Sequence, residues 1–231
     1  MGIRVFLAGS EGSGKTSCIA ALLPGLAADH VVLTTDPEAP ELWSDGRPRQ
    51  LLGPRWTRTH RAVRAAFRRV GLHTLFLVPN FGLRLVLARA LEATHQPDVS
   101  LYDADLLIHP VAYARYHFAP ARWLPARHWL RAAGWLAGGR RRTLIFFLAR
   151  PPSEAAARIA GRDDPRDASL DRDLGRLERE LDEVVEAARG CGYEIVRLDA
   201  AGRAPAEIAR SIDAVVRRHL GATQVPGGRR E

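Results

Sequence analysis

A glycine-rich octapeptide near the start of the chain places the strongest constraint on its fold. Residues 9–16 read Gly-Ser-Glu-Gly-Ser-Gly-Lys-Thr and fit the pattern G-x-x-x-x-G-K-[ST] of phosphate-binding loops. The apolar run 3–8 predicts a buried strand, and residues 17–23 predict a helix that Pro24 and Gly25 close. Strand, glycine loop and helix in this order are the context that the motif needs, and they predict an α/β domain.

The loop also predicts a specific chemistry. Glycines allow successive backbone N–H groups to turn toward one anion, and the N-terminus of the next helix adds positive potential there. Lys15, the single lysine among 34 basic residues, would reach the β- and γ-phosphates, and Thr16 would offer its hydroxyl to Mg²⁺. The alternative is a glycine-rich turn that fits the pattern by chance. The residues expected to bind ATP are Gly9, Ser10, Glu11, Gly12, Ser13, Gly14, Lys15, Thr16 and Ser17.

Length and composition narrow the class of protein. A chain of 231 residues suits one domain, which we expect over residues 1–222, followed by a disordered tail at 223–231. The two cysteines are too few for a disulfide framework, no apolar run approaches about 18 residues, and we expect a cytoplasmic protein. The net charge of +8 suits a polyanionic partner, an anionic membrane surface or a phosphorylated substrate. No nucleic-acid-binding motif is present, so we expect no nucleic-acid partner.

Acidic residues follow two predicted strands, residues 31–35 and 99–102. Ligands of open α/β sheets bind at the carboxyl ends of parallel strands, so these acids are expected beside the acceptor substrate. Asp103 is also placed to hold the water shell of Mg²⁺, with the N-cap of a following helix as the alternative role. The acids concerned are Asp36 and Glu38 after the first strand, and Asp103 and Asp105 after the second.

The middle of the chain has weaker patterns. Residues 44–58 predict an irregular loop, residues 59–70 and 83–94 predict helices, and residues 75–78 fit either a strand or the start of a helix. Residues 111–139 interleave tryptophans with arginines. This segment fits either a helical pair packed on the domain or an interfacial membrane helix, which would make a peripheral membrane contact through residues 118–137.

The last third of the chain has the clearest alternation of elements. Residues 143–149 predict a strand, and Ser153 is expected to cap a helix that runs to about residue 159. Further elements are a helix at 170–189, a strand at 194–199 and a helix at 205–220. Three histidines, His109, His117 and His128, lack metal-ligand spacing and are expected to be ordinary polar residues.

Several of these landmarks together resemble the thymidylate kinase family of nucleoside and nucleotide kinases. The phosphate-binding loop matches well, and residues 31–37 resemble the family's second strand, which ends in an acid–proline pair like Asp36–Pro37. Tyr102–Asp103 falls where the family has an Asp–Arg pair, and residues 145–159 are similar to its strand, helix and the beginning of its lid. The resemblance implies a three-layer fold: a parallel sheet of about five strands, helices on both faces and an arginine-bearing lid.

The resemblance also implies roles for residues of this chain. The acceptor pocket would be built from about residues 36–139, and the lid from about 158–170. Lys15 would hold the transferring phosphoryl group, Thr16 and Asp103 would hold Mg²⁺, and Asp36 would orient or deprotonate the acceptor. Relatives are often dimers, so the resemblance implies a homodimer. The lid arginines that would close over the phosphates are Arg158, Arg162 and Arg166.

Two departures from the family pattern affect the acceptor. Ala104 stands where the family has the arginine of its Asp–Arg pair, and Thr35 stands where it usually carries another arginine. Both arginines would normally hold a phosphate of the acceptor. Replacements could come from Arg84, Arg89 or Arg115, and the stretch from Asp105 to Pro110 together with Tyr113 is similar to a motif of accessory kinases with other acceptors.

Three functions follow as hypotheses. The first is an ATP- and Mg²⁺-dependent kinase whose acceptor is a nucleoside, a nucleotide or a related small molecule, with Asp36 as base where the acceptor is a hydroxyl. The second is a true dTMP kinase, whose ionised acceptor needs no base. The third is a nucleotide-binding regulatory or scaffold protein that acts at a membrane or on a partner without turnover.

Overall fold

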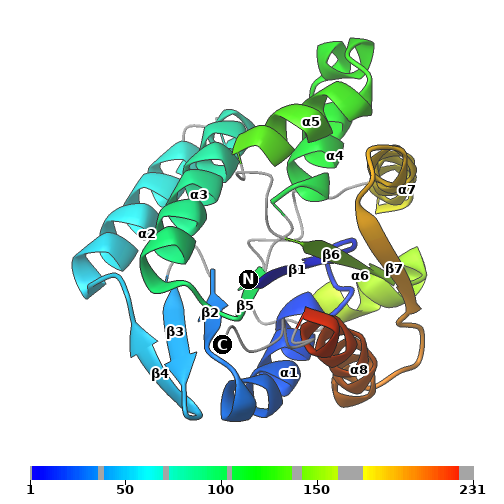
Figure 1. The fold of residues 1–231 in the computed structure, drawn as a ribbon. Coiled ribbons are helices and arrows are strands. Elements are labelled where there is room, and N and C mark those ends of the chain that lie inside the picture. Colours follow the sequence, from blue (N-terminus) through cyan, green and yellow to red (C-terminus); the bar gives the residue numbers. More distant parts are fainter. Residues whose placement is uncertain are drawn as a thin grey trace.

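The computed structural model describes residues 2–35, 39–69, 73–102, 106–136, 142–160 and 174–223. Within them, seven strands form one sheet in the order β4-β3-β2-β5-β1-β6-β7 (Figure 1). The strands are β1 (Ile3–Ala8), β2 (Val32–Thr34), β3 (Glu41–Ser44), β4 (Arg47–Gln50), β5 (Val99–Tyr102), β6 (Thr143–Ala149) and β7 (Glu194–Asp199).

Five of these strands, β2, β5, β1, β6 and β7, pair in parallel. All six residues of β1 are buried, as expected for a central strand covered on both faces. Val5 pairs with Leu101 of β5 on one side and with Leu144 of β6 on the other. The predicted α/β class and the parallel sheet of about five strands are therefore confirmed, and β1 lies in the middle of that sheet.

An antiparallel hairpin, β3–β4, extends the sheet where an irregular loop was expected over residues 44–58. Its turn is made by Asp45 and Gly46, both with positive φ (52° and 69°), which is the pair that two-residue hairpin turns prefer. The expectation was wrong because β4 is exposed along its whole length, so it lacks the apolar pattern of a strand. The remainder of the predicted loop contains the start of α2 (Pro54–Arg69).

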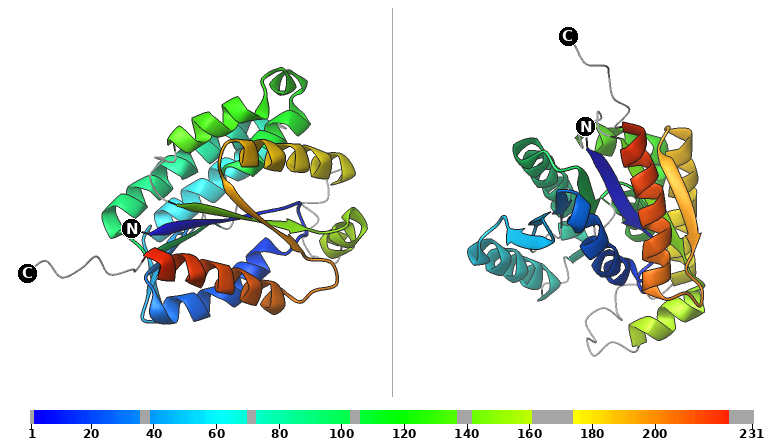
Figure 2. Two further views of the ribbon diagram at one scale, coloured as in Figure 1. Left: turned by 45° about the vertical axis from the view of Figure 1, so that its right-hand side comes forward. Right: turned by 60° about the horizontal axis from the view of Figure 1, so that its bottom comes forward.

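Helices cover both faces of the sheet (Figure 2). On one face, α1 (Lys15–Asp29) and α8 (Pro205–Thr223) pack in a core with the buried side chains of β1 and β6. On the other face, α3 (His73–His95), α4 (Ile108–His117), α5 (Ala126–Leu136) and α7 (Leu174–Gly190) share a second core. The 3₁₀ helix η1 (Ala119–Trp123) joins α4 to α5, and α6 (Pro152–Ala160) follows β6.

Three helix boundaries differ from expectation. α1 continues through Pro24 to Asp29 because Leu26 and Ala27 are fully buried, and their burial offsets the hydrogen bond that a proline cannot donate. α3 begins at His73, about ten residues before the helix expected at 83–94, and residues 75–78 lie near its start, which was one of the two alternatives for that run. α6 begins at Pro152, so Ser153 lies in the first turn instead of capping it, since proline suits the first helical position.

Several predictions fall partly or wholly outside the described residues. These are the roles of Asp36, Glu38, Asp103 and Asp105, the lid beyond Ala160 with Arg162 and Arg166, and the tail from residue 224 onward; Thr223 itself ends α8. In the part of the chain that is described, no helix combines the length and the apolar character needed to cross a membrane.

Candidate phosphate-binding site

The glycine loop connects β1 to α1 in a conformation that only glycine adopts easily. Gly9, Gly12 and Gly14 have φ values of 141°, 76° and 96°, and Gly14 is the N-cap of α1. Ser13 N–H donates to the carbonyl of Ser10 at 3.2 Å, which closes the turn. The loop therefore delivers the N-terminus of α1 to the carboxyl end of the central strand, where its positive potential favours an anion.

Close packing holds the loop against β6 and α6. A Cβ atom on Gly9 would lie 2.7 Å from the carbonyl oxygen of Leu148, the penultimate residue of β6. A Cβ atom on Gly12 would lie 2.6 Å from the carbonyl oxygen of Ala155 in α6. Both distances are too short for a side chain, so these positions require glycine for space as well as for φ.

Lys15 folds back over the loop. Its Nζ donates to the carbonyl oxygens of Gly9 and Ser10, both at 2.9 Å, and to Ser13 Oγ at 3.4 Å. The ammonium group thus lies against the loop, while Thr16 and Ser17 are exposed in the first turn of α1. Ser10 is buried, and its Oγ has no hydrogen-bond partner among the described residues.

Arginines from three elements lie near the start of α1. Nη1 of Arg158, on α6, is 3.1 Å from the position that a Cβ atom of Gly14 would take. Burial raises the pKa of the Cys18 thiol, while the positive charges of Arg150, Arg158 and Arg203 partly oppose that rise. The positive charges of all three arginines therefore act on a thiol in the first turn of α1, and Arg158 is the one in close contact with the N-cap of that helix.

Arg158 was expected at this site, whereas Arg150 and Arg203 were not among the predicted site residues. Arg150 directly follows β6 and is buried, and its Nη1 donates to Glu154 Oε2 at 2.7 Å. The same carboxylate oxygen accepts from Gly202 N–H at 3.3 Å, which ties α6 to the loop after β7. The position of Arg150 at the carboxyl end of a predicted strand was the signal that could have identified it.

A second group of side chains lies on the α3–α4 side of Lys15. His109 is buried, and its ring stacks on that of Tyr113 with centroids 4.9 Å apart. Burial, with the positive charges of Lys15 and then Arg84, holds the pKa of His109 well below its usual range. His109 thus contacts Tyr113 and is affected by the charges of Lys15, from the loop, and of Arg84, from α3.

Other residues considered for the acceptor site have structural partners. Arg115 donates to Glu180 at 2.9 Å and to Glu183 at 2.6 Å, so it ties α4 to α7. Thr35, at the end of β2, is buried and its hydroxyl donates to the Leu101 carbonyl at 3.3 Å. Of the three arginines expected to replace those missing from the family pattern, Arg84 is the one whose charge acts on His109 beside the loop.

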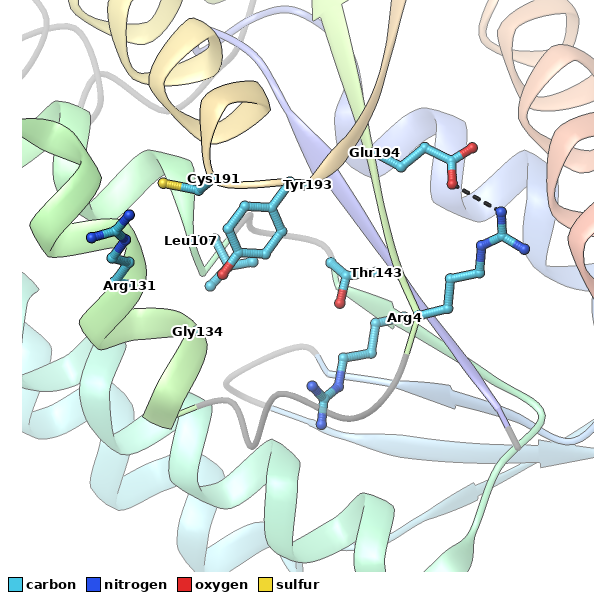
Figure 3. Close-up of a pocket in the computed structure, with 10 residues that line it drawn as sticks. Arg4, Leu107, Arg131, Gly134, Thr143, Cys191, Tyr193 and Glu194 are labelled. Atoms are coloured by element: carbon cyan, nitrogen blue, oxygen red, sulfur yellow. Dashed lines mark hydrogen bonds and ion pairs between the residues drawn. The ribbon is translucent and has the colours of Figure 1, made fainter.

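A cavity of about 540 Å³ lies at the opposite edge of the sheet (Figure 3). Its lining includes Arg4, Arg142 and Glu194, which stand at or just before the amino ends of their strands. Arg142 donates to Glu194 at 3.1 Å, and Arg4 is held by Glu92. The cavity is thus distinct from the loop, and the charges of these two arginines are already compensated.

The two residues expected to hold Mg²⁺ were Thr16 and Asp103. Among the described residues, no group of three or more His, Cys, Asp or Glu side chains could hold a metal ion. Thr16 is placed at the start of α1, and Asp103, the other expected ligand, is outside the described part of the chain.

In comparisons with known proteins, neither the models of protein families nor the curated proteins contain a match to this chain.

Proposed function

We propose that this protein is an ATP- and Mg²⁺-dependent phosphotransferase that acts on a small-molecule acceptor. The observation that carries the proposal is the placement of the chain's single lysine at the first residue of α1, directly after a three-glycine loop whose last glycine, Gly14, lies next to the guanidinium group of Arg158. Phosphoryl transfer requires positioning and charge neutralisation more than covalent chemistry, and this arrangement supplies both.

Each part of the loop has a role in this proposal. Backbone N–H groups of residues 9–16 bind the β- and γ-phosphates, and Lys15 leaves its three oxygen partners to neutralise their charge. Arg158 binds phosphate oxygens from the α6 side, with Arg162 and Arg166 of the lid as further donors. Mg²⁺, held by Thr16 and Asp103, would neutralise charge on the phosphates during transfer.

The acceptor is proposed to bind on the α3–α4 side of the loop. In this proposal the acceptor lies near His109, which stacks on Tyr113 and is affected by the charges of Lys15 and Arg84, and Arg84 supplies a cation. A cation in this position favours an acceptor that already carries negative charge, such as a nucleoside monophosphate, and supports the dTMP kinase alternative. For a hydroxyl acceptor, Asp36 would act as base and Glu38 and Asp105 would orient the substrate.

ATP turnover with Mg²⁺ against a panel of nucleosides, nucleoside monophosphates and simple sugars tests the proposal. We expect one class of acceptor to stimulate turnover, and Lys15→Ala to lower the rate by a factor of about 10²–10³. Full activity of Lys15→Ala would exclude the proposed role of the loop. Tight ATP binding with no stimulation by any acceptor would instead favour the nucleotide-binding regulatory protein.

One matched pair of variants and one further variant identify the residues that bind the acceptor. Arg84→Ala should raise KM for a phosphorylated acceptor, whereas Arg89→Ala, on the exposed side of the same helix, should not. Asp36→Asn should abolish turnover of a hydroxyl acceptor and leave turnover of a monophosphate acceptor largely intact. Equal effects of Arg84→Ala and Arg89→Ala would show that Arg84 does not bind the acceptor.

A further inference from the structure

The charges of this chain are divided unevenly along its length. Residues 46–153 contain 18 arginines and 4 acidic residues, whereas the rest of the chain contains 16 basic and 22 acidic residues. The stretch from residue 106 to residue 153 has eight arginines and no acidic residue. The positive charge of the protein is therefore concentrated in the part of the chain that includes α2 to α5.

Two tryptophans in this region are exposed to an unusual degree. Trp123, in η1, is 88% exposed, and Trp135, in α5, is 78% exposed. The neighbouring Leu124 and Leu136 are also exposed. Large aromatic side chains usually bury most of their surface in a folded domain, so two open indoles bracketing one helix indicate a surface that binds something apolar.

The two sides of α5 differ sharply. Leu130 is fully buried, and Trp129 and Ala133 pack with it in the core beside α7. Arg127, Arg131 and Trp135 recur every four residues and are exposed, and Arg131 also lines the mouth of the cavity in Figure 3. In Figure 1, α5 lies along the upper edge of the view, away from the sheet. This exposed side, together with Trp123, Leu124 and Leu136, is called the α5 face below.

The positive charge of the α5 face is not compensated by acids of the described structure. The side chains of Arg127 and Arg131 form no hydrogen bond or ion pair with other described residues, in contrast to Arg115 and Arg122, which pair with acids of α7. Since neither η1 nor α5 contains an acidic residue, the α5 face is both cationic and apolar.

We infer that the α5 face docks on a lipid bilayer that contains anionic headgroups. Tryptophan and leucine side chains would enter the interface, and the arginines would bind headgroup phosphates while their aliphatic stems stay in contact with apolar groups. The combination favours a bilayer over nucleic acid, because the exposed leucines have no role in binding a phosphate backbone. In this arrangement α5 lies in the plane of the lipid–water interface. Binding of this kind requires no catalytic turnover.

Flotation of the full chain with vesicles tests this inference. Binding is expected with phosphatidylcholine vesicles that contain phosphatidylglycerol, and tryptophan fluorescence should shift to shorter wavelength on binding. Each basic residue near an anionic surface contributes a factor of about five to partitioning, so Arg127→Gln with Arg131→Gln should weaken binding about 25-fold. Higher ionic strength should weaken binding of the wild type in the same direction.

Two further variants make the test specific. Arg210→Gln with Arg218→Gln removes the same charge from the exposed side of α8 and should leave binding within about twofold. Trp123→Ala with Trp135→Ala should weaken binding by at least about tenfold, with thermal stability nearly unchanged because both side chains are exposed. Equal losses in the α5 and α8 arginine variants would overturn the inference, as would unchanged binding in the tryptophan variant. The inference would also be overturned if an RNA oligonucleotide displaced the protein from the vesicles and bound the tryptophan variant as well as it bound the wild type.

Discussion

The buried ion pair between Arg4 and Glu92 allows a sharp test of the structure, because it joins β1, which leads into the glycine loop, to α3, which carries Arg84. Arg4 Nε donates to both carboxylate oxygens of Glu92, at 3.0 and 2.9 Å, and Arg4 Nη2 donates to Oε2 at 2.6 Å. Tyr102 Oη donates to Oε1 at 2.8 Å. The side chains of Arg4 and Glu92 are 6% and 3% exposed, so water screens this pair very little.

Glu92→Gln is expected to be strongly destabilising. The substitution keeps the shape of the side chain but leaves the Arg4 guanidinium buried without a compensating charge. Breaking a buried pair from one side typically costs about 3–5 kcal/mol, which for a domain of this size lowers Tm by about 6–20 °C. Tyr102→Phe removes a single hydrogen bond to the carboxylate and should cost less, about 1.5–3 kcal/mol.

A double-mutant cycle measured by urea unfolding isolates the pair. Arg4→Met combined with Glu92→Met removes both charges, so it should recover more than about 2 kcal/mol relative to the sum of the two single variants. The reasoning would be refuted if Glu92→Gln lowered the free energy of unfolding by less than about 1 kcal/mol, or if the effects in the cycle were additive. Either result would show that Arg4 and Glu92 do not depend on each other for charge compensation away from water.

The pH dependence of the same variant provides an independent measurement. Burial alone would raise the pKa of Glu92, but hydrogen bonds and charge from Arg4, with the hydrogen bond from Tyr102, bring it below its usual range. A lowered pKa in the folded state means that the stabilisation is complete above the unfolded pKa of about 4.3 and is lost as pH falls through the folded value. The stability difference between wild type and Glu92→Gln should therefore shrink in acid.

Three further predictions concern positions where the structure is tight or desolvated. Gly12 has a φ of 76°, and a Cβ atom there would lie 2.6 Å from a carbonyl oxygen of α6, so Gly12→Ala should lower the free energy of unfolding by about 1–3 kcal/mol and weaken nucleotide binding. A Cβ atom on Gly25 would have no neighbour within 4 Å, so Gly25→Ala should stabilise α1 by about 0.5–1 kcal/mol in the same unfolding assay. Gly134→Ala would place Cβ 2.2 Å from Tyr193 Oη and should lower the free energy of unfolding by about 1–3 kcal/mol. Adding Tyr193→Phe should restore most of this loss, because the nearest remaining atom of the ring, Cζ, is 3.5 Å away. Additive losses in the double variant would contradict this explanation. NMR titration of His109 should show a pKa well below about 6.5, the value for an unperturbed histidine. Because the pKa is lowered only in the folded state, the protein should lose stability as pH falls below about 6.5, where the unfolded chain takes up the proton more readily. A normal titration would contradict the burial of His109 and the effect of the Lys15 and Arg84 charges.

Much of the fold could be predicted because its elements are encoded by neighbouring residues. Residues 99–102, 143–149 and 194–199 are strands with the predicted bounds. The mostly apolar β5 and β6 are buried, as expected for parallel strands covered on both faces, whereas β7 alternates polar and apolar residues at the edge of the sheet and is partly exposed. The β3–β4 hairpin was missed even though the Asp45–Gly46 pair was present, because its strands are largely exposed and lack that pattern. The predicted end of α1 at Pro24 is wrong because the burial of Leu26 and Ala27 outweighs the hydrogen bond that a proline cannot donate.

The sequence by itself determined the glycine loop, since three glycines, one lysine and the flanking apolar runs are all local to residues 3–23. Only the tertiary structure decided which distant side chains surround that loop. Arg4 and Glu92 are 88 residues apart, and Arg158 reaches Gly14 only because α6 packs against the loop. The lowered pKa of His109 likewise depends on burial and on charges from other elements. Local periodicity encodes strands and helices, whereas desolvation and through-space charge depend on elements brought together by folding.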